Sequence, residues 1–338
     1  MSTTTTAISW TDATWNPLRG CSRVSTGCEH CYAERQAGRF SGAGQPYAGL
    51  VRKTSGGWRW TGVVRLIAQE LETPLRWTKP RRIFVNSMSD LFHDAVSEDL
   101  IDAVLAVMAL APQHTFQVLT KRPARMLAYL TERWPRPLAP GWTGPGPRRD
   151  PPAEMARADR HQQILTTAAR LLHGPLGKQA RFWTSDGRPH SHAQPWPLPN
   201  VWWGVSIENQ DTADARIPWL LQTLAAVRFV SDEPALAAVD LVPYLDEHGW
   251  TTAGAHRGLD WVICGGESGP QARPCDLAWL RSVVQQCQAA GVACWVKQLG
   301  SRPCDGSRRV LAHHNAGADP AEWPEDLRVQ QWPEVSHG

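Results

Sequence analysis

The chain has no long hydrophobic run and only a small excess of one charge, and each absence removes a class of protein. No stretch of its 338 residues comes near the roughly 18 uninterrupted apolar residues that a membrane helix needs. Residues 1–15, MSTTTTAISWTDATW, have neither the basic nor the apolar segment of a secretion signal. The net charge of +3 does not by itself identify a nucleic-acid or membrane partner. We therefore expect a soluble cytoplasmic protein with no membrane partner, whose oligomeric state the sequence leaves open.

Phenylalanine and tyrosine are scarce, with six and four residues, whereas tryptophan occurs 18 times. Most of the tryptophans stand at apolar positions of expected strands and helices, which indicates packing rather than base stacking. A hydrophobic content of 42% in a chain of this length is enough to bury one large core. We therefore expect a single domain with additions.

Six short apolar runs recur along the chain, and each is followed by a polar cluster and usually by a helix-like segment. Continuous apolar runs that alternate with helices are typical of a buried parallel sheet. One such helix is expected from Ser97 and another from Asp276, each with one apolar face. The pattern predicts an α/β, barrel-like fold. The runs are 83–86 (IFVN), 116–119 (FQVL), 201–205 (VWWGV), 227–230 (VRFV), 261–263 (WVI) and 292–296 (VACWV).

Two segments depart from this rhythm. Residues 134–199 contain seven prolines between Pro135 and Pro152, and we interpret them as a Pro-rich helical insertion on the barrel. Residues 301–338 are polar, and we expect this C-terminal tail to pack loosely. The barrel domain would then occupy residues 1–300, with the insertion inside it.

Polar side chains follow every expected strand. Active sites of βα barrels are built at the carboxyl ends of the strands, so these residues are candidates for a shared site. Any one of them is equally well explained as a helix cap or a solvated loop residue, but all six clusters together indicate function. The clusters are Asn86, Ser87, Ser89 and Asp90; Thr120, Lys121 and Arg122; Ser206, Glu208 and Asn209; Ser231, Asp232 and Glu233; Gly265, Gly266, Glu267 and Ser268; and Lys297 and Gln298.

Three of the eight cysteines lie within eleven residues, in the segment 20–34 (GCSRVSTGCEHCYAE). Cys21, Cys28 and Cys31 have the spacing C-x6-C-x2-C, and a reducing compartment favours metal binding over disulfides for such a group. Three thiolates on a [4Fe-4S] cluster leave one iron open to a small molecule. A zinc site with His30 as fourth ligand is the main alternative, followed by unmetallated core or reactive cysteines. The position of His30 between two ligands makes tetrahedral closure awkward, which favours the cluster.

Longer blocks surround these motifs: 20–34, 84–96 (FVNSMSDLFHDAV), 116–123 (FQVLTKRP), 200–210 (NVWWGVSIENQ), 260–274 (DWVICGGESGPQARP) and 290–300 (AGVACWVKQLG). Through them the sequence resembles the phage Gp37/Gp68 family, also described as three-Cys-motif proteins, over residues 8–300 apart from the insertion. That family in turn resembles radical S-adenosylmethionine enzymes. The resemblance implies a partial or complete TIM-like (βα) barrel with the cluster loop after the first strand.

The resemblance also implies two cofactors, a [4Fe-4S] cluster on the three cysteines and S-adenosylmethionine, and a partner that donates electrons. His30, just before the last cysteine, would lie near the adenine, and Ser87 and Asp90 would hold the methionine end. Pocket groups that orient substrate or move protons would be Lys121, Glu208, Glu233, Glu267 and Lys297.

This sequence departs from the larger superfamily in two ways. Its first cysteine spacing is three residues longer than the usual C-x3-C, and Gly265, Gly266 and Glu267 follow a late strand rather than the second one. Whether this glycine loop binds cofactor, binds substrate or is a plain tight turn stays open.

A second interpretation belongs to another class of protein. A non-catalytic, zinc-binding, nucleic-acid-associated phage protein would contact phosphates through dispersed basic residues. For an enzyme, a nucleic-acid substrate also stays open, and the sequence does not identify the substrate. The basic residues are Arg81, Arg82, Lys121, Arg122, Arg148 and Arg149.

Overall fold

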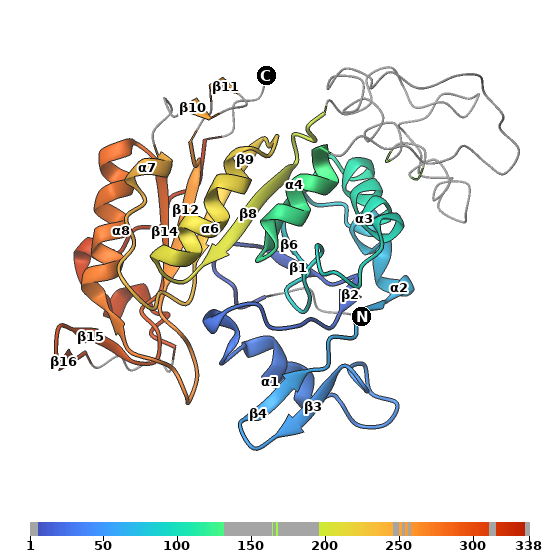
Figure 1. Cartoon of the computed structure of the whole chain (residues 1–338), viewed down its shortest axis with the longest axis horizontal. Coiled ribbons are helices and arrows are strands. Elements are labelled where there is room, and N and C mark those ends of the chain that lie inside the picture. Colours follow the sequence, from blue (N-terminus) through green and yellow to red (C-terminus); the bar gives the residue numbers. More distant parts are fainter. Residues whose placement is uncertain are drawn as a thin grey trace, which may run out of the picture.

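The computed structural model describes residues 6–131, 164, 167, 196–245, 250–251, 254–255, 258–310 and 316–334. A parallel sheet of seven strands forms the centre, and neighbours in the sheet are also neighbours in chain order (Figure 1). The sheet curls into a half barrel flanked by helices, which is compatible with the expected partial βα barrel (Figure 1). Its strands are β1 (Ala13–Trp15), β6 (Arg82–Val85), β7 (Thr115–Thr120), β8 (Val201–Ile207), β9 (Val227–Asp232), β12 (Trp261–Gly265) and β14 (Ala293–Gln298).

Four longer helices accompany the sheet: α3 (Glu98–Leu110), α4 (Pro123–Thr131), α6 (Gln210–Leu221) and α8 (Leu277–Ala290). The two helices expected from Ser97 and Asp276 are confirmed, since these residues are the N-caps of α3 and α8. The Asp276 side chain accepts a hydrogen bond from the amide of Ala278 at 3.0 Å, which satisfies one of the free donors of the first turn.

The two faces of the sheet bury different side chains, because successive strand residues point to opposite sides. Ile83 and Val85 join the main apolar cluster with the helices, whereas Phe84 between them joins a smaller cluster rich in tryptophan. Gly204 makes room in this smaller cluster, because a Cβ there would lie 2.5 Å from the ring of Phe229. Packing roles are thereby confirmed for the buried tryptophans of this cluster, Trp10, Trp202, Trp261 and Trp295.

A small unit projects from the half barrel just after the cysteine loop (Figure 1). It consists of α1 (Tyr32–Arg39) and an antiparallel hairpin of β3 (Val51–Thr54) and β4 (Gly57–Trp60). The remaining short elements are β2 (Leu18–Arg19), η1 (Thr26–Cys28), β5 (Arg65–Leu66), α2 (Ala68–Leu71), η2 (Thr73–Arg76), α7 (Val242–Leu245), β10 (Trp250–Thr251), β11 (Gly254–Ala255), β13 (Cys275–Asp276), β15 (Pro303–Asp305), β16 (Arg308–Arg309), η4 (Pro320–Glu322) and η5 (Glu325–Leu327).

The expectation of a loosely packed tail is wrong for its described part. The amide of Val296 donates to the carbonyl of Val329 at 2.8 Å, and the amide of Gln331 donates to that of Cys294 at 2.8 Å. The ring of Trp332 packs against that of Trp295 at a tilt of 57°, with centroids 4.7 Å apart. Strand β14 lies at the edge of the sheet, where its outer backbone groups have no neighbouring strand. The tail pairs with these groups, and its few apolar residues suffice to hold it against β14.

Most of the predicted insertion, residues 134–199, lies outside the described residues. Ile164 is described and is fully buried in the main apolar cluster, so this segment contributes at least one core side chain. None of the described helices combines the length and the apolar character needed to span a bilayer.

Candidate functional site

The loop that carries the three cysteines lies at the carboxyl end of the first strands of the sheet. Gly20 pairs with Ser89 in a parallel bridge, and its amide donates to the carbonyl of Met88 at 3.2 Å. Gly20 has φ +100°, and a Cβ there would lie 2.1 Å from the carbonyl oxygen of Val63. Only glycine fits this position. The pairing of Gly20 with Met88 and Ser89 holds the start of the loop against the turn that follows β6.

The thiols of Cys21, Cys28 and Cys31 are free and partly buried. Burial, and secondly the carboxylate of Asp90, raises the pKa of Cys21 to about 12, and burial raises the pKa of Cys31. A raised pKa argues against Cys21 and Cys31 as activated nucleophiles, since those need a lowered pKa. The Cys28 and Cys31 side chains lie near enough to Cys21 to raise its pKa further.

The donor set fits an iron–sulfur cluster in its chemistry, with three unpaired thiols on one short loop. In the part of the chain that is described, however, no group of three or more Cys, His, Asp or Glu side chains is gathered tightly enough to hold a metal ion. The three thiols would therefore have to draw together around a cluster. The same finding applies to a zinc site that includes His30.

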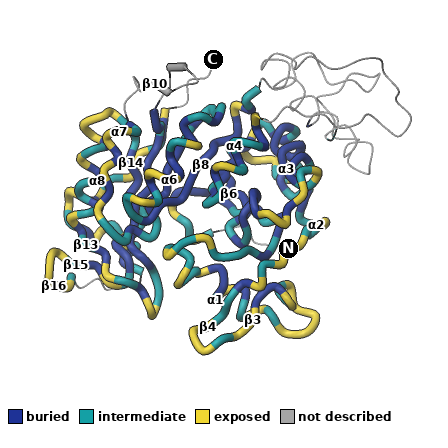
Figure 2. The backbone as a smooth tube through the Cα atoms, in the orientation of Figure 1, coloured by how far each residue is buried: buried dark blue, intermediate teal, exposed yellow. Residues whose placement is uncertain are grey.

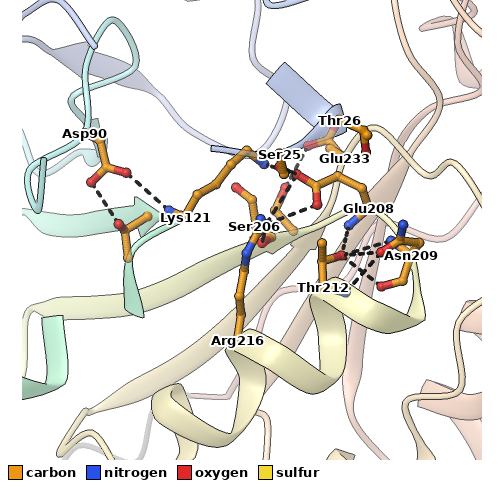
Figure 3. A network of polar contacts seen from close by, with 12 residues as sticks. Ser25, Thr26, Asp90, Lys121, Ser206, Glu208, Asn209, Thr212, Arg216 and Glu233 are labelled. Atoms are coloured by element: carbon orange, nitrogen blue, oxygen red, sulfur yellow. Dashed lines mark hydrogen bonds and ion pairs between the residues drawn. The ribbon is translucent and has the colours of Figure 1, made fainter. Parts of the chain in front are cut away.

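Glu208, at the end of β8, is the centre of a buried polar network beneath the loop (Figure 3). Its carboxylate lies 2.9 Å from Lys121 Nζ and 3.1 Å from a guanidinium nitrogen of Arg216, and it accepts a hydrogen bond of 2.5 Å from the Ser25 hydroxyl. Burial opposes ionisation, but Lys121 and Arg216 outweigh it and hold the pKa of Glu208 below its usual value. A Cβ on Gly27 would lie 2.3 Å from this carboxylate, so the cysteine loop rests directly on Glu208.

Asp90 forms a second network at the end of β6. One carboxylate oxygen accepts hydrogen bonds from the Thr120 hydroxyl and the Phe92 amide, and the other pairs with the Arg122 guanidinium at 3.0 Å. Arg122 also donates to the Ser22 hydroxyl at 2.8 Å. Asp90 is thus buried and committed to partners within the chain, and it positions the loop through Arg122.

A third connection reaches the loop from the segment after β12. The Glu267 carboxylate lies 2.7 Å from the Arg273 guanidinium and 3.0 Å from Nδ1 of His30. Arg273 also donates to the carbonyl of Thr26 at 3.0 Å. Although burial opposes it, hydrogen bonds from Arg273 and His30 lower the pKa of Glu267. His30, expected beside an adenine, lies within the cysteine loop and is held there by Glu267.

The glycines before Glu267 are explained by packing. A Cβ on Gly266 would lie 2.3 Å from the carbonyl oxygen of Leu299, and one on Gly265 would lie 2.9 Å from that of Gln298. The chain here passes close to the end of β14, where the register between β12 and β14 shifts. Close backbone packing therefore accounts for both glycines without a ligand.

Glu233 and Lys297 form an ion pair with a separation of 2.8 Å, and side-chain exposures of 13% and 23% leave it accessible. Beside it, Asp232 is fully buried, and neither of its carboxylate oxygens has a hydrogen-bond partner among the described residues. Burial, reinforced by the charges of Glu233 and Glu208, raises the pKa of Asp232 well above its usual value. At this edge of the site, burial therefore favours the protonated form of Asp232.

The structure brings most of the predicted site residues to one edge of the sheet. Ser87 also lies there, where its hydroxyl donates to the Asn16 side chain at 3.1 Å and its carbonyl accepts from Tyr32 at 2.7 Å. Ser25, Arg216 and Arg273 were missed. Arg216 had a recognisable signal, because it stands among Ala213, Ile217 and Leu220 on the apolar face of α6 and so needs a buried acidic partner.

A family profile described as "Protein of unknown function (DUF5131)" matches residues 5–323. No curated protein and no solved structure matches the chain. The comparisons therefore add a family and assign no activity to the site.

Proposed function

We propose that this chain, which belongs to the DUF5131 family, is an iron–sulfur enzyme of the radical S-adenosylmethionine type. Cys21, Cys28 and Cys31 would hold the cluster. The resemblance of its sequence blocks to the Gp37/Gp68 proteins, and through them to radical enzymes, is part of this proposal. When bound, a four-iron cluster with one open iron supplies the electron that cleaves S-adenosylmethionine and so begins hydrogen abstraction.

The observation that carries the proposal is the attachment of the cysteine loop to three strand ends at once. Ser25 reaches Glu208 after β8, Ser22 reaches Arg122 after β7, and His30 reaches Glu267 after β12. The loop thereby faces the edge at which βα-barrel enzymes carry their chemistry. A purely structural metal site would need no such connection to the strand ends.

The charged residues divide into two tasks. Lys121 and Glu208 neutralise each other beneath the loop, and Glu208 has no exposed surface, so this pair holds the loop in place. The side chains of Glu233 and Lys297 are 13% and 23% exposed, whereas that of Glu208 is fully buried, and within the described ranges no ion pair joins Glu233 or Lys297 to the cysteine loop. We assign them to the substrate: Lys297 Nζ would hold a proton or a carbonyl oxygen, and the Glu233 carboxylate would keep that ammonium charged.

Metal analysis after anaerobic reconstitution tests the proposal. Wild type should carry about four irons and four sulfides per chain with broad absorbance near 400 nm. Cys28→Ala should abolish this signal. Cys304→Ala is the matched control, since this thiol is also free and partly buried but lies far along the chain. Stoichiometric zinc without sulfide would instead support the non-catalytic zinc protein.

A further inference from the structure

We propose that the projecting unit of residues 32–66, which holds α1, β3 and β4, is a docking surface for single-stranded nucleic acid. The inference rests on the proposed function and names the class of its substrate. Charge is distributed unevenly along the chain, which the small net charge of +3 conceals.

Residues 32–66 contain six cations and one acidic residue, Glu34, which is buried and paired with Arg23. The whole chain has a net charge of +3, so the residues outside this unit together carry a small negative charge. A small unit in which cations far outnumber acidic residues has the electrostatic signature of phosphate binding. The six cations are Arg35, Arg39, Arg52, Lys53, Arg59 and Arg65.

The hairpin places like charges opposite each other. Arg52 pairs directly with Arg59 across the ladder, so their side chains leave the ribbon on the same face. Like charges in this position destabilise a hairpin unless an anion lies between them. Arg59 is partly neutralised by Glu34 at 3.7 Å, whereas Arg52 and Lys53 are exposed and form no ion pair with any carboxylate in the described ranges. A phosphate would relieve this repulsion.

The same unit carries two exposed aromatic side chains. Phe40 at the end of α1 is 44% exposed and Tyr32 at its start is 47% exposed. Duplex DNA offers no free base faces, whereas an unpaired base can stack on an exposed ring. The combination of cations with exposed rings favours a single strand. Figure 2 shows exposed residues at the tip of the hairpin and along the loop between α1 and β3.

The unit is joined directly to the cysteine loop. Helix α1 begins at the residue after Cys31, and the amide of Gly62 donates to the carbonyl of Cys21 at 3.2 Å. Cys21 and Cys31 pack against the same apolar cluster as Val51 and Trp60 of the hairpin. A strand bound to the unit would therefore pass beside the loop, where the proposed chemistry takes place.

Fluorescence anisotropy with a labelled single-stranded oligonucleotide tests the proposal, because it measures binding without activity. The double variant Arg52→Gln/Lys53→Gln should reduce the salt dependence of log K by about 1.4, since each lost contact to a single strand is worth about 0.7. The matched control is Arg308→Gln/Arg309→Gln, an exposed basic pair on β16, which should leave binding unchanged. Equal losses in both double variants would overturn the proposal.

Three further measurements test the chemical class of the bound ligand. Phe40→Ala should weaken binding of the single strand by roughly tenfold and leave binding of heparin unchanged, because only a base stacks. DNA and RNA strands compared side by side identify the sugar. Preference for duplex DNA, equally tight binding of heparin, or binding of anionic phospholipid vesicles in place of the oligonucleotide would overturn the proposal.

A protein without the cluster distinguishes failure of the docking surface from failure of the proposed function. The same titration with Cys28→Ala protein, which should lack the cluster, is expected to give unchanged affinity. Loss of binding in the hairpin variant alone supports the docking surface whether or not iron is present. Iron-loaded protein that does not bind the oligonucleotide overturns this inference alone.

Discussion

Glu208→Gln removes a negative charge that faces two buried or partly buried cations. The Lys121 and Arg216 side chains are only 18% and 8% exposed, at 2.9 and 3.1 Å from the carboxylate. Removing one partner of a buried ion pair costs about 3–5 kcal/mol of unfolding free energy. Lys121 can turn partly toward solvent, so we expect the lower end of this range, about 3 kcal/mol.

The sign of the pH dependence follows from the lowered pKa of Glu208. A carboxyl group whose pKa is lower in the folded state stabilises the protein above its unfolded pKa of about 4.3. That contribution disappears as the pH falls through the lower folded value. The difference between wild type and Glu208→Gln should therefore be full at pH 7 and shrink below about pH 4.

Urea unfolding followed by tryptophan fluorescence measures this difference. Asp211→Asn is the matched control: it makes the same charge change on an exposed residue of the first turn of α6, where the cost is about 0.3–1 kcal/mol. A Glu208→Gln variant as stable as the control at pH 7 would refute the view that Glu208 holds the buried cations and the loop.

Three other changes test neighbouring parts of the account. Asp232→Asn should gain stability relative to wild type by about 1.4 kcal/mol per pH unit between the unfolded pKa of Asp232 and its raised folded pKa. The reason is that the folded wild type retains a proton on Asp232 that the unfolded chain releases. A stability difference in urea unfolding that does not change with pH would contradict this. Gly204→Ala should lower the free energy of unfolding by about 1–3 kcal/mol, because the added methyl group overpacks against Phe229. Gly42→Ala in an open loop should cost far less. Equal melting temperatures for the two variants would contradict this. Asp90→Ala should lower iron content and S-adenosylmethionine affinity in parallel in metal analysis and calorimetry, because Asp90 positions the cysteine loop through Arg122; a loss of S-adenosylmethionine affinity with full iron content would contradict this.

The sheet could be predicted from the sequence because its signal is local. Each of the six apolar runs became a strand of the parallel sheet, since a strand buried on both faces has no polar residues to alternate with. The hairpin of β3 and β4 was missed: two of its four ladder pairs contain a charged residue, and a half-exposed strand of this kind resembles a loop.

The residues of the site could be predicted better than their partners. Polar residues that follow strands meet at one edge of any parallel sheet, so Glu208, Glu233 and Glu267 were found from position alone. The bond between Ser25 and Glu208 spans 183 residues and depends on how the cysteine loop folds back, which no local pattern encodes. The tail was misjudged for the same reason, because its contacts are with a strand far away in the sequence.

The most direct test of the central claim is chromatographic detection of 5'-deoxyadenosine after anaerobically reconstituted, reduced protein is mixed with S-adenosylmethionine. The account predicts 5'-deoxyadenosine and methionine from wild type and from Cys304→Ala, and neither product from Cys28→Ala. A wild-type protein that carries its full iron and sulfide, is reduced, and yet forms no 5'-deoxyadenosine would contradict it.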